Sequence, residues 1–118
     1  MIDGFTDSHV FSFLVDNNIT TQKNQLYFIK QKDTNFYKIG ISSDIEKRFK
    51  AIQNGNPTEL TIYYNEVFYL CDIIEKCLHK FLESQHIRGE WFEIPDDKIN
   101  ELIKKINKIP FKYEQNKT

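Results

Sequence analysis

Residues 36–57, FYKIGISSDIEKRFKAIQNGNP, contain the patterns of a strand, a turn and a helix in one continuous run. The FYKIGI portion is rich in β-branched and aromatic residues, which favour a strand. Ser43, followed three residues later by Glu46, is the capping-box pattern that begins many helices. An Asn-Gly pair and a proline then end the helix. Arg48, one of only two arginines in the chain, therefore lies on a helix that directly follows a strand.

Strand and helix patterns before and after this run predict a small α+β fold. Strands are expected at 25–30, 35–41 and 60–70, and helices at 44–53, at 71–84 and from 95 to the proline at 110. Residues 87–94, IRGEWFEI, are expected to form a short turn and an extended segment, with Trp91 and Phe92 packing the last helix against the sheet. A β-hairpin, a helix and a third strand together give a small three-stranded, mainly antiparallel sheet packed by helices.

The strand FYKIGI presents alternate residues to opposite faces of that sheet. Tyr37, Ile39 and Ile41 point to one face, whereas Lys38 and Gly40 point to the other. A glycine inside a strand usually marks a bulge or the close approach of another part of the chain. Together with a tyrosine from the adjacent strand, Lys38 and Gly40 are expected to form a cradle for an anionic group.

The length of 118 residues is that of one ordinary domain. We expect this domain at 25–110, with an arm or short helix at 1–24 before it and a loosely held tail at 111–118 after it. The hydrophobic fraction of 40% argues against disorder. No apolar run is long enough to span a bilayer, so no membrane association is expected.

The net charge of −1 gives no overall basic field, so a nucleic-acid-binding role needs a local basic patch. Cys71 and Cys77 lie six residues apart, outside any zinc-binding spacing, and are expected to be small apolar helix residues in a reducing compartment. Aspartates near the N-terminus stand where an export signal would carry positive charge. A cytoplasmic location is expected, or the host cytoplasm or nucleus for a viral protein.

Four segments in order, LYFIK, the YKIGI strand with its helix, EKCLHKFL and GEWFEI, resemble the GIY-YIG endonuclease superfamily over about residues 25–94. The similarity is closest to a compact branch, common in viral and bacterial proteins, that has KIG in place of YIG. The resemblance implies a nuclease that hydrolyses DNA phosphodiester bonds with one divalent cation, Mg²⁺ or Mn²⁺. It also implies DNA as the partner. The nuclease would be low in specificity, structure-selective, or dependent on a specificity-providing protein or a homodimer.

The resemblance assigns roles at the following positions: catalytic, Tyr27, Lys38, Arg48 and His79; metal-binding, Glu75; structural at the site, Gly40. The planar guanidinium of Arg48 suits two oxygens of one phosphate. Tyr27 would accept or relay a proton from the attacking water, which requires a nearby cation such as Lys38 or the metal because a free phenol has a pKa of about 10. Lys47 and Lys50, which flank Arg48, are expected to contact phosphate groups.

Simpler interpretations exist for the same residues. Arg48 would pair with Asp44 one turn earlier, as surface arginines often do. Glu75 would complete a capping box with Asp72 and so close a helix end. His79 and Tyr27 would serve only as packing residues. In that case the chain would be a catalytically weak or inactive module that binds nucleic acid or a protein partner.

Overall fold

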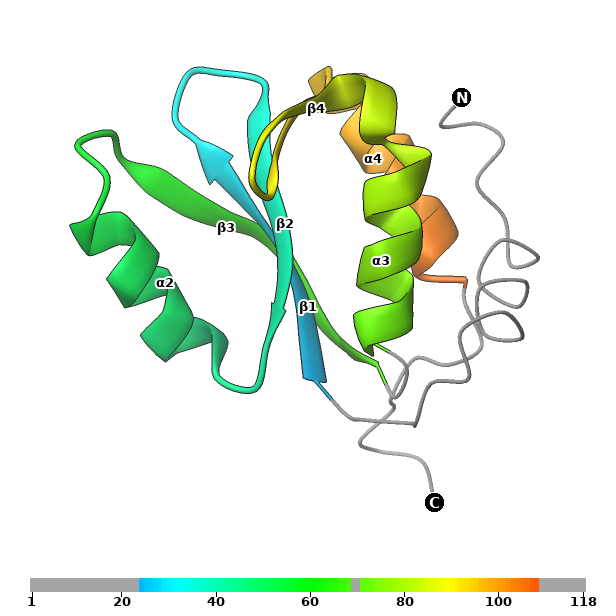
Figure 1. Ribbon diagram of the computed structural model, residues 1–118, viewed down its shortest axis with the longest axis horizontal. Coiled ribbons are helices and arrows are strands. Elements are labelled where there is room, and N and C mark those ends of the chain that lie inside the picture. Colours follow the sequence, from blue (N-terminus) through cyan, green and yellow to red (C-terminus); the bar gives the residue numbers. More distant parts are fainter. Residues whose placement is uncertain (1–23, 69–70, 109–118) are drawn as a thin grey trace.

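The computed structural model describes residues 24–68 and 71–108, which form a sheet of five strands with three α-helices against it (Figure 1). The arm predicted at 1–24 lies outside these residues except for its last position, and the tail predicted at 111–118 lies outside them altogether. The elements, in chain order, are β1 (Asn24–Gln31), β2 (Phe36–Ser42), α2 (Ile45–Asn54), β3 (Leu60–Phe68), α3 (Cys71–Phe81), the 3-10 turn η2 (Glu83–Gln85), β4 (His86–Arg88), β5 (Trp91–Glu93) and α4 (Asp96–Ile106).

The sheet has the strand order β3-β1-β2-β5-β4, and all neighbouring strands are antiparallel. The α+β class is confirmed, but the predicted sheet of three strands was too small. Strands β4 and β5 form a second hairpin, each with only three residues. That length is too short for a period-2 pattern to stand out in the sequence.

The β4–β5 hairpin covers only part of β2. The pairs between β2 and β5 run from Phe36 to Lys38, and the backbone amide of Ile39 then donates to the carbonyl oxygen of Glu90 at 3.0 Å. Residues 40–42 of β2 pair with β1 on one side and with no strand of the described structure on the other. One edge of β2 is therefore open at its C-terminal end.

Two apolar clusters lie on opposite faces of the sheet, and Figure 1 shows α2 on one side and α3 and α4 on the other. The larger cluster joins β1 and β2 to α3 and α4 through residues such as Phe28, Ile39 and Leu78. The smaller cluster contains Tyr27 and Ile29, against which Phe49 of α2 packs. Central strand β1 is buried on both faces because helices cover both.

Helix α2 begins one residue later than the capping-box prediction. Its N-cap is Asp44, whose side chain accepts a hydrogen bond from the backbone amide of Lys47 at 3.2 Å. Aspartate is as good an N-cap as serine, and here it occupies the extended backbone position that the cap requires. The helix ends at the predicted Asn-Gly stop, where Gly55 donates to carbonyl oxygens of the last turn.

Helix α3 carries both cysteines, and their thiols are free and buried, as expected for apolar helix residues. Burial raises the pKa of Cys77 to about 11, so this thiol is protonated and unreactive at neutral pH. Within the described residues, no helix has the length and apolar character needed to cross a membrane.

Candidate active site

Tyr27 and Gly40 are directly paired across strands β1 and β2. A β-carbon built at Gly40 would lie 2.5 Å from the Tyr27 hydroxyl oxygen and 2.9 Å from Oε1 of Glu90. Any side chain at position 40 would therefore displace the phenol or the carboxylate. The glycine marks a close approach, as the sequence predicted, and the ladder between β1 and β2 runs through it without a bulge.

Arg48 reaches the Tyr27 hydroxyl from α2. Its Nε lies 3.5 Å from the phenol oxygen, at the outer limit of a hydrogen bond. The simpler pairing of the guanidinium with Asp44 is not formed; these two residues share only the helical backbone hydrogen bond. Arg48 is otherwise exposed, so its guanidinium faces both the tyrosine and solvent.

The phenol of Tyr27 is neutral at physiological pH. Burial raises its pKa above the ordinary value of 10, and the hydrogen bond from Arg48 opposes this rise without cancelling it. The sequence analysis proposed Lys38 as a cation beside this tyrosine. In the structure Arg48 makes the hydrogen bond to the Tyr27 hydroxyl, whereas the Lys38 ammonium pairs with Glu90.

Glu90 comes from the tight turn between β4 and β5 and faces the open edge of β2. Its Oε1 lies 3.3 Å from Nζ of Lys38, and both side chains are largely shielded from solvent. The geometry is that of an ion pair rather than a hydrogen bond, since Oε1 is buried without a hydrogen-bond partner in the described structure. Lys38 also lies over the Trp91 ring, 5.7 Å from its centroid.

Glu75 of α3 approaches Glu90 from the other side of the β2 edge. Burial raises the pKa of Glu75 to about 7, and the charge of Glu90 and a hydrogen bond to it add to the effect. The side chain of Glu75 is only 15% exposed. The alternative that Glu75 closes a capping box is wrong, because its partner Asp72 lies inside α3 rather than before it.

His79 lies one turn after Glu75 on α3. Its Nε2 is 2.8 Å from the carbonyl oxygen of Ile39 and 4.0 Å from the nearer oxygen of Glu75. Its ring packs edge-on against Phe92, with centroids 5.0 Å apart. His79 thus ties α3 to β2 next to Glu75, and it makes the packing contact that the simpler interpretation expected.

The structure brings five of the six predicted catalytic, metal-binding and structural residues into contacts at the C-terminal half of β2, and Lys38 joins them through Glu90. Lys47 and Lys50 lie exposed on α2, beside Arg48 in sequence. The sequence analysis gave Glu90 no role. Only the pairing of β5 with β2 brings its carboxylate to the site.

Trp91 was expected to pack the last helix against the sheet, and this expectation was wrong. Phe92 does pack in the cluster with α4, but Trp91 belongs to the cluster on the α2 face. Neighbouring residues of a strand point to opposite faces, so only one of the two aromatic rings can face α4.

The site contains carboxylates that could hold a divalent cation. Two carboxylates, Glu75 and Glu90, lie close enough to raise a pKa, and one of their oxygens is buried without a hydrogen bond. In the described structure no group of three or more His, Cys, Asp or Glu side chains is arranged to hold a metal ion. Mg²⁺ commonly binds one or two carboxylates and completes its shell with water and phosphate oxygens.

Comparison with known proteins gives one family match. The model of the T5orf172 domain matches residues 24–107, which contain every strand and helix described above. No curated protein matches this chain. No solved structure matches it either.

Proposed function

Because the chain belongs to the T5orf172 domain family, we propose that it is a metal-dependent endonuclease that hydrolyses DNA phosphodiester bonds. Family membership by itself indicates a nuclease-like or nucleic-acid-binding role. The observation that carries the finer proposal is the meeting of a phenol, a guanidinium and a partly buried carboxylate pair at the open edge of β2. The resemblance to the GIY-YIG superfamily supports the same assignment.

Arg48 would bind the phosphate that is cleaved. Hydrolysis adds negative charge to the oxygens on phosphorus, and a guanidinium that is always charged stabilises that charge. Arg48 is held at one end by the Tyr27 hydroxyl and is open to solvent elsewhere, so a DNA phosphate can reach it. Lys47 and Lys50 are exposed on the same helix and would contact the neighbouring phosphates.

Tyr27 would orient the attacking water and relay its proton. The water oxygen forms the new bond to phosphorus, the bond from phosphorus to the leaving oxygen breaks, and the leaving oxygen takes up a proton. A neutral phenol can accept a proton on its oxygen while giving up its own. Gly40 makes this possible by leaving room for the hydroxyl in the sheet.

Glu75 would hold the divalent cation, with Glu90 next to it. When bound, Mg²⁺ would neutralise the charge that develops on the leaving oxygen. Lys38 pairs with the Glu90 carboxylate and would hold it in place, and His79 would fix α3 against β2 so that Glu75 faces the edge of the sheet.

A cleavage assay tests this proposal. The full chain is incubated with supercoiled plasmid, linear duplex and branched DNA in Mg²⁺, in Mn²⁺ and in EDTA, beside a Glu75→Gln variant. We expect nicking that requires the metal and falls by at least about 100-fold in the variant. Cleavage in EDTA, or equal cleavage by the variant, would contradict the assignment of Glu75.

The second candidate is a nucleic-acid-binding module without cleavage. The exposed basic side chains of α2 favour this second function. They provide a local basic patch, which a chain with a net charge of −1 needs in order to bind nucleic acid. A folded chain that shifts DNA in a gel in a salt-dependent manner, but never cuts it, would support this second function instead.

A further inference from the structure

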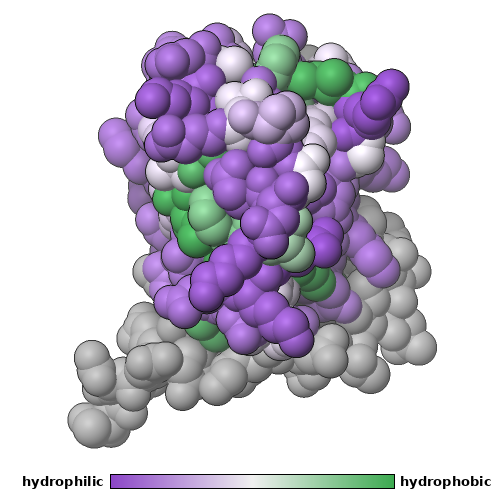
Figure 2. All heavy atoms as spheres, turned by 90° about the vertical axis from the view of Figure 1, so that its left-hand side faces the viewer, coloured by the Kyte–Doolittle hydropathy of each residue, from purple (hydrophilic) through white to green (hydrophobic). Residues whose placement is uncertain are grey.

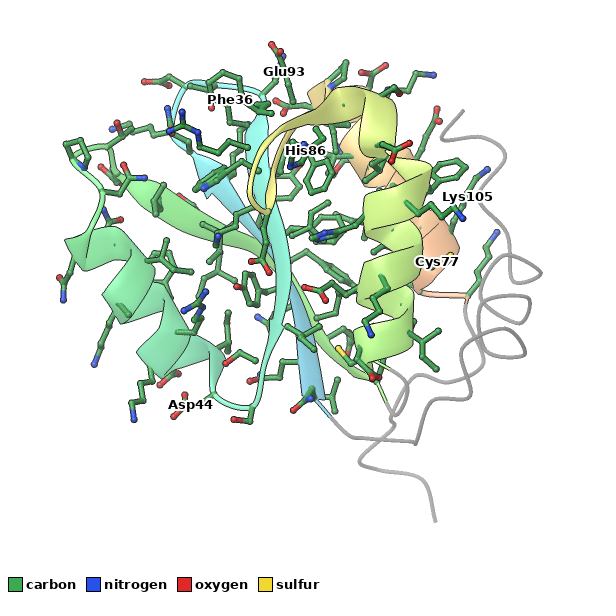
Figure 3. The ribbon with its side chains drawn as sticks, in the orientation of Figure 1. Phe36, Asp44, Cys77, His86, Glu93 and Lys105 are labelled. Atoms are coloured by element: carbon green, nitrogen blue, oxygen red, sulfur yellow. The ribbon has the colours of Figure 1, made fainter. Side chains whose placement is uncertain are left out.

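A cavity of about 380 Å³ lies beyond the site, on the face of the sheet that carries α2. It is lined by Gln31, Phe36, Asn56, Ile87, Arg88 and Trp91, which come from four separate parts of the fold. Figure 3 labels Phe36 at the end of β2 that borders the cavity and Asp44 near the opposite end. The volume falls in the range of sites for small organic groups. None of the roles proposed above uses this cavity.

The lining combines three kinds of chemistry. Phe36 and Trp91 supply aromatic faces and Ile87 an apolar wall. Gln31 and Asn56 carry amide groups, each of which both donates and accepts hydrogen bonds. A flat heterocycle with donors and acceptors on its edge is the ligand class that stacks on aromatic rings and binds amides in this way.

The cavity is solvent-accessible, and a hydrogen bond holds one of its lining side chains in place. Ile87 is 48% exposed, which makes it the one exposed large hydrophobic side chain in the described part of the chain. Oδ1 of Asn56 accepts a hydrogen bond from the Thr58 amide at 2.9 Å, which fixes this side chain at the end of α2. The surrounding face is largely hydrophilic, with small apolar areas between the polar side chains (Figure 2).

The cavity lies at one end of a row of β2 side chains that leads to the Tyr27 hydroxyl, which Arg48 contacts. Phe36, Lys38 and Gly40 follow one another along one face of β2, with the cavity at Phe36 and the Tyr27 hydroxyl at Gly40. Four residues of strand span about 13 Å, at roughly 3.3 Å per residue. A few nucleotides of one strand can therefore extend from Arg48 to the cavity, with Lys38 between the two sites and Arg88 at the far end.

We propose that this cavity binds an unpaired nucleobase of the DNA strand that is cleaved. A base inside a duplex is stacked and paired, so it cannot insert between the side chains of this cavity without leaving the helix. The inference rests on the proposed nuclease function and deepens it. The substrate class becomes DNA with an unpaired base a few nucleotides from the cleaved phosphate, such as a single strand, a flap or a distorted duplex.

Trp91 provides the measurement, because it is the only tryptophan in the chain. A base stacked in the cavity should quench its fluorescence. The full chain in EDTA, with the DNA checked for integrity on a gel, is titrated with an oligothymidylate of eight nucleotides. The same backbone with abasic sites, and the oligothymidylate paired to its complement, are titrated in parallel.

We expect saturable quenching by the single strand, and binding of the abasic strand about 5- to 150-fold weaker, since stacking contributes roughly 1–3 kcal/mol per base. Phe36→Leu keeps the apolar contact and the tryptophan reporter, and should weaken the single-strand affinity about fivefold or more. Lys104→Ala, which removes an exposed charge on α4, is the matched control and should leave it unchanged.

Equal binding of the abasic and the normal strand would overturn the inference, and so would quenching by the duplex as strong as by the single strand. The plasmid assay reports separately on the proposed function. Base-dependent quenching in a chain that never cuts DNA would leave the cavity assignment standing and remove the nuclease. Cleavage without base-dependent quenching would support the nuclease and remove the cavity assignment.

Discussion

The Tyr27 hydroxyl occupies the space that a side chain at Gly40 would need, since a β-carbon there would lie 2.5 Å from the phenol oxygen. This pair joins the two central strands and places the buried phenol in the apolar cluster on the α2 face, within reach of Arg48. The close approach of Tyr27 and Glu90, rather than a turn, therefore requires the glycine at this position.

Gly40→Ala tests this relationship. The added methyl group forces Tyr27 or Glu90 to move, and we expect a loss of about 1–3 kcal/mol in the free energy of unfolding together with loss of cleavage. Urea denaturation and the plasmid assay measure the two effects. Gly55→Ala is the matched control, because its β-carbon would meet only ordinary contacts at 3.9 Å. Equal stability of the two variants would contradict the packing argument.

The raised pKa of Glu75 predicts that the free energy of unfolding depends on pH. The folded protein raises the pKa of Glu75 from 4.5 to about 7, so between these values the folded state holds a proton that the unfolded chain releases. The free energy of unfolding therefore falls as pH rises through this window, by up to about 3 kcal/mol. Glu75→Gln should lack this contribution.

Urea denaturation at pH 5 and pH 8 measures that difference, with the parent and Glu75→Gln treated alike so that other titrating groups cancel. Adding Mg²⁺ at pH 8 should restore part of the stability of the parent and leave the variant unchanged. If the two proteins lost the same stability between these pH values, Glu75 would not be the group that titrates.

The Lys38–Glu90 ion pair makes a separate prediction. Lys38→Met leaves the Glu90 carboxylate poorly solvated beside Glu75, and we expect a loss of about 1–3 kcal/mol in stability. Glu90→Gln in the same chain should recover much of that loss, because the uncompensated charge is then gone. A double-mutant cycle by urea denaturation measures the coupling. Additive effects of the two changes would show that the pair is not coupled.

The central part of the fold could be predicted from the sequence because its patterns are long and regular. The strand 35–41 and the helix 44–53 match β2 and α2 to within one residue at each end. The β4–β5 hairpin was missed because strands of three residues carry no readable alternation.

The site could be predicted in part for the same reason. Alternation along β2 placed Lys38 and Gly40 on one face, and the adjacent strand supplied Tyr27, which the structure confirms. The contact between Glu75 and Glu90 depends on how α3 and the β5 turn approach the open edge of β2. Such a contact is set by tertiary structure, and no local pattern in the sequence indicates it.

The most direct test of the central claim compares Arg48→Ala with Lys47→Ala in the plasmid assay with Mg²⁺. Both side chains are exposed on α2, so both variants should keep their stability to within about 0.5 kcal/mol. Of these two residues, only Arg48 contacts the Tyr27 hydroxyl. We expect Arg48→Ala to reduce cleavage by about 100- to 1,000-fold and Lys47→Ala to reduce it by a few-fold. Equal cleavage by the two variants would contradict a phosphodiester hydrolysis site at Arg48.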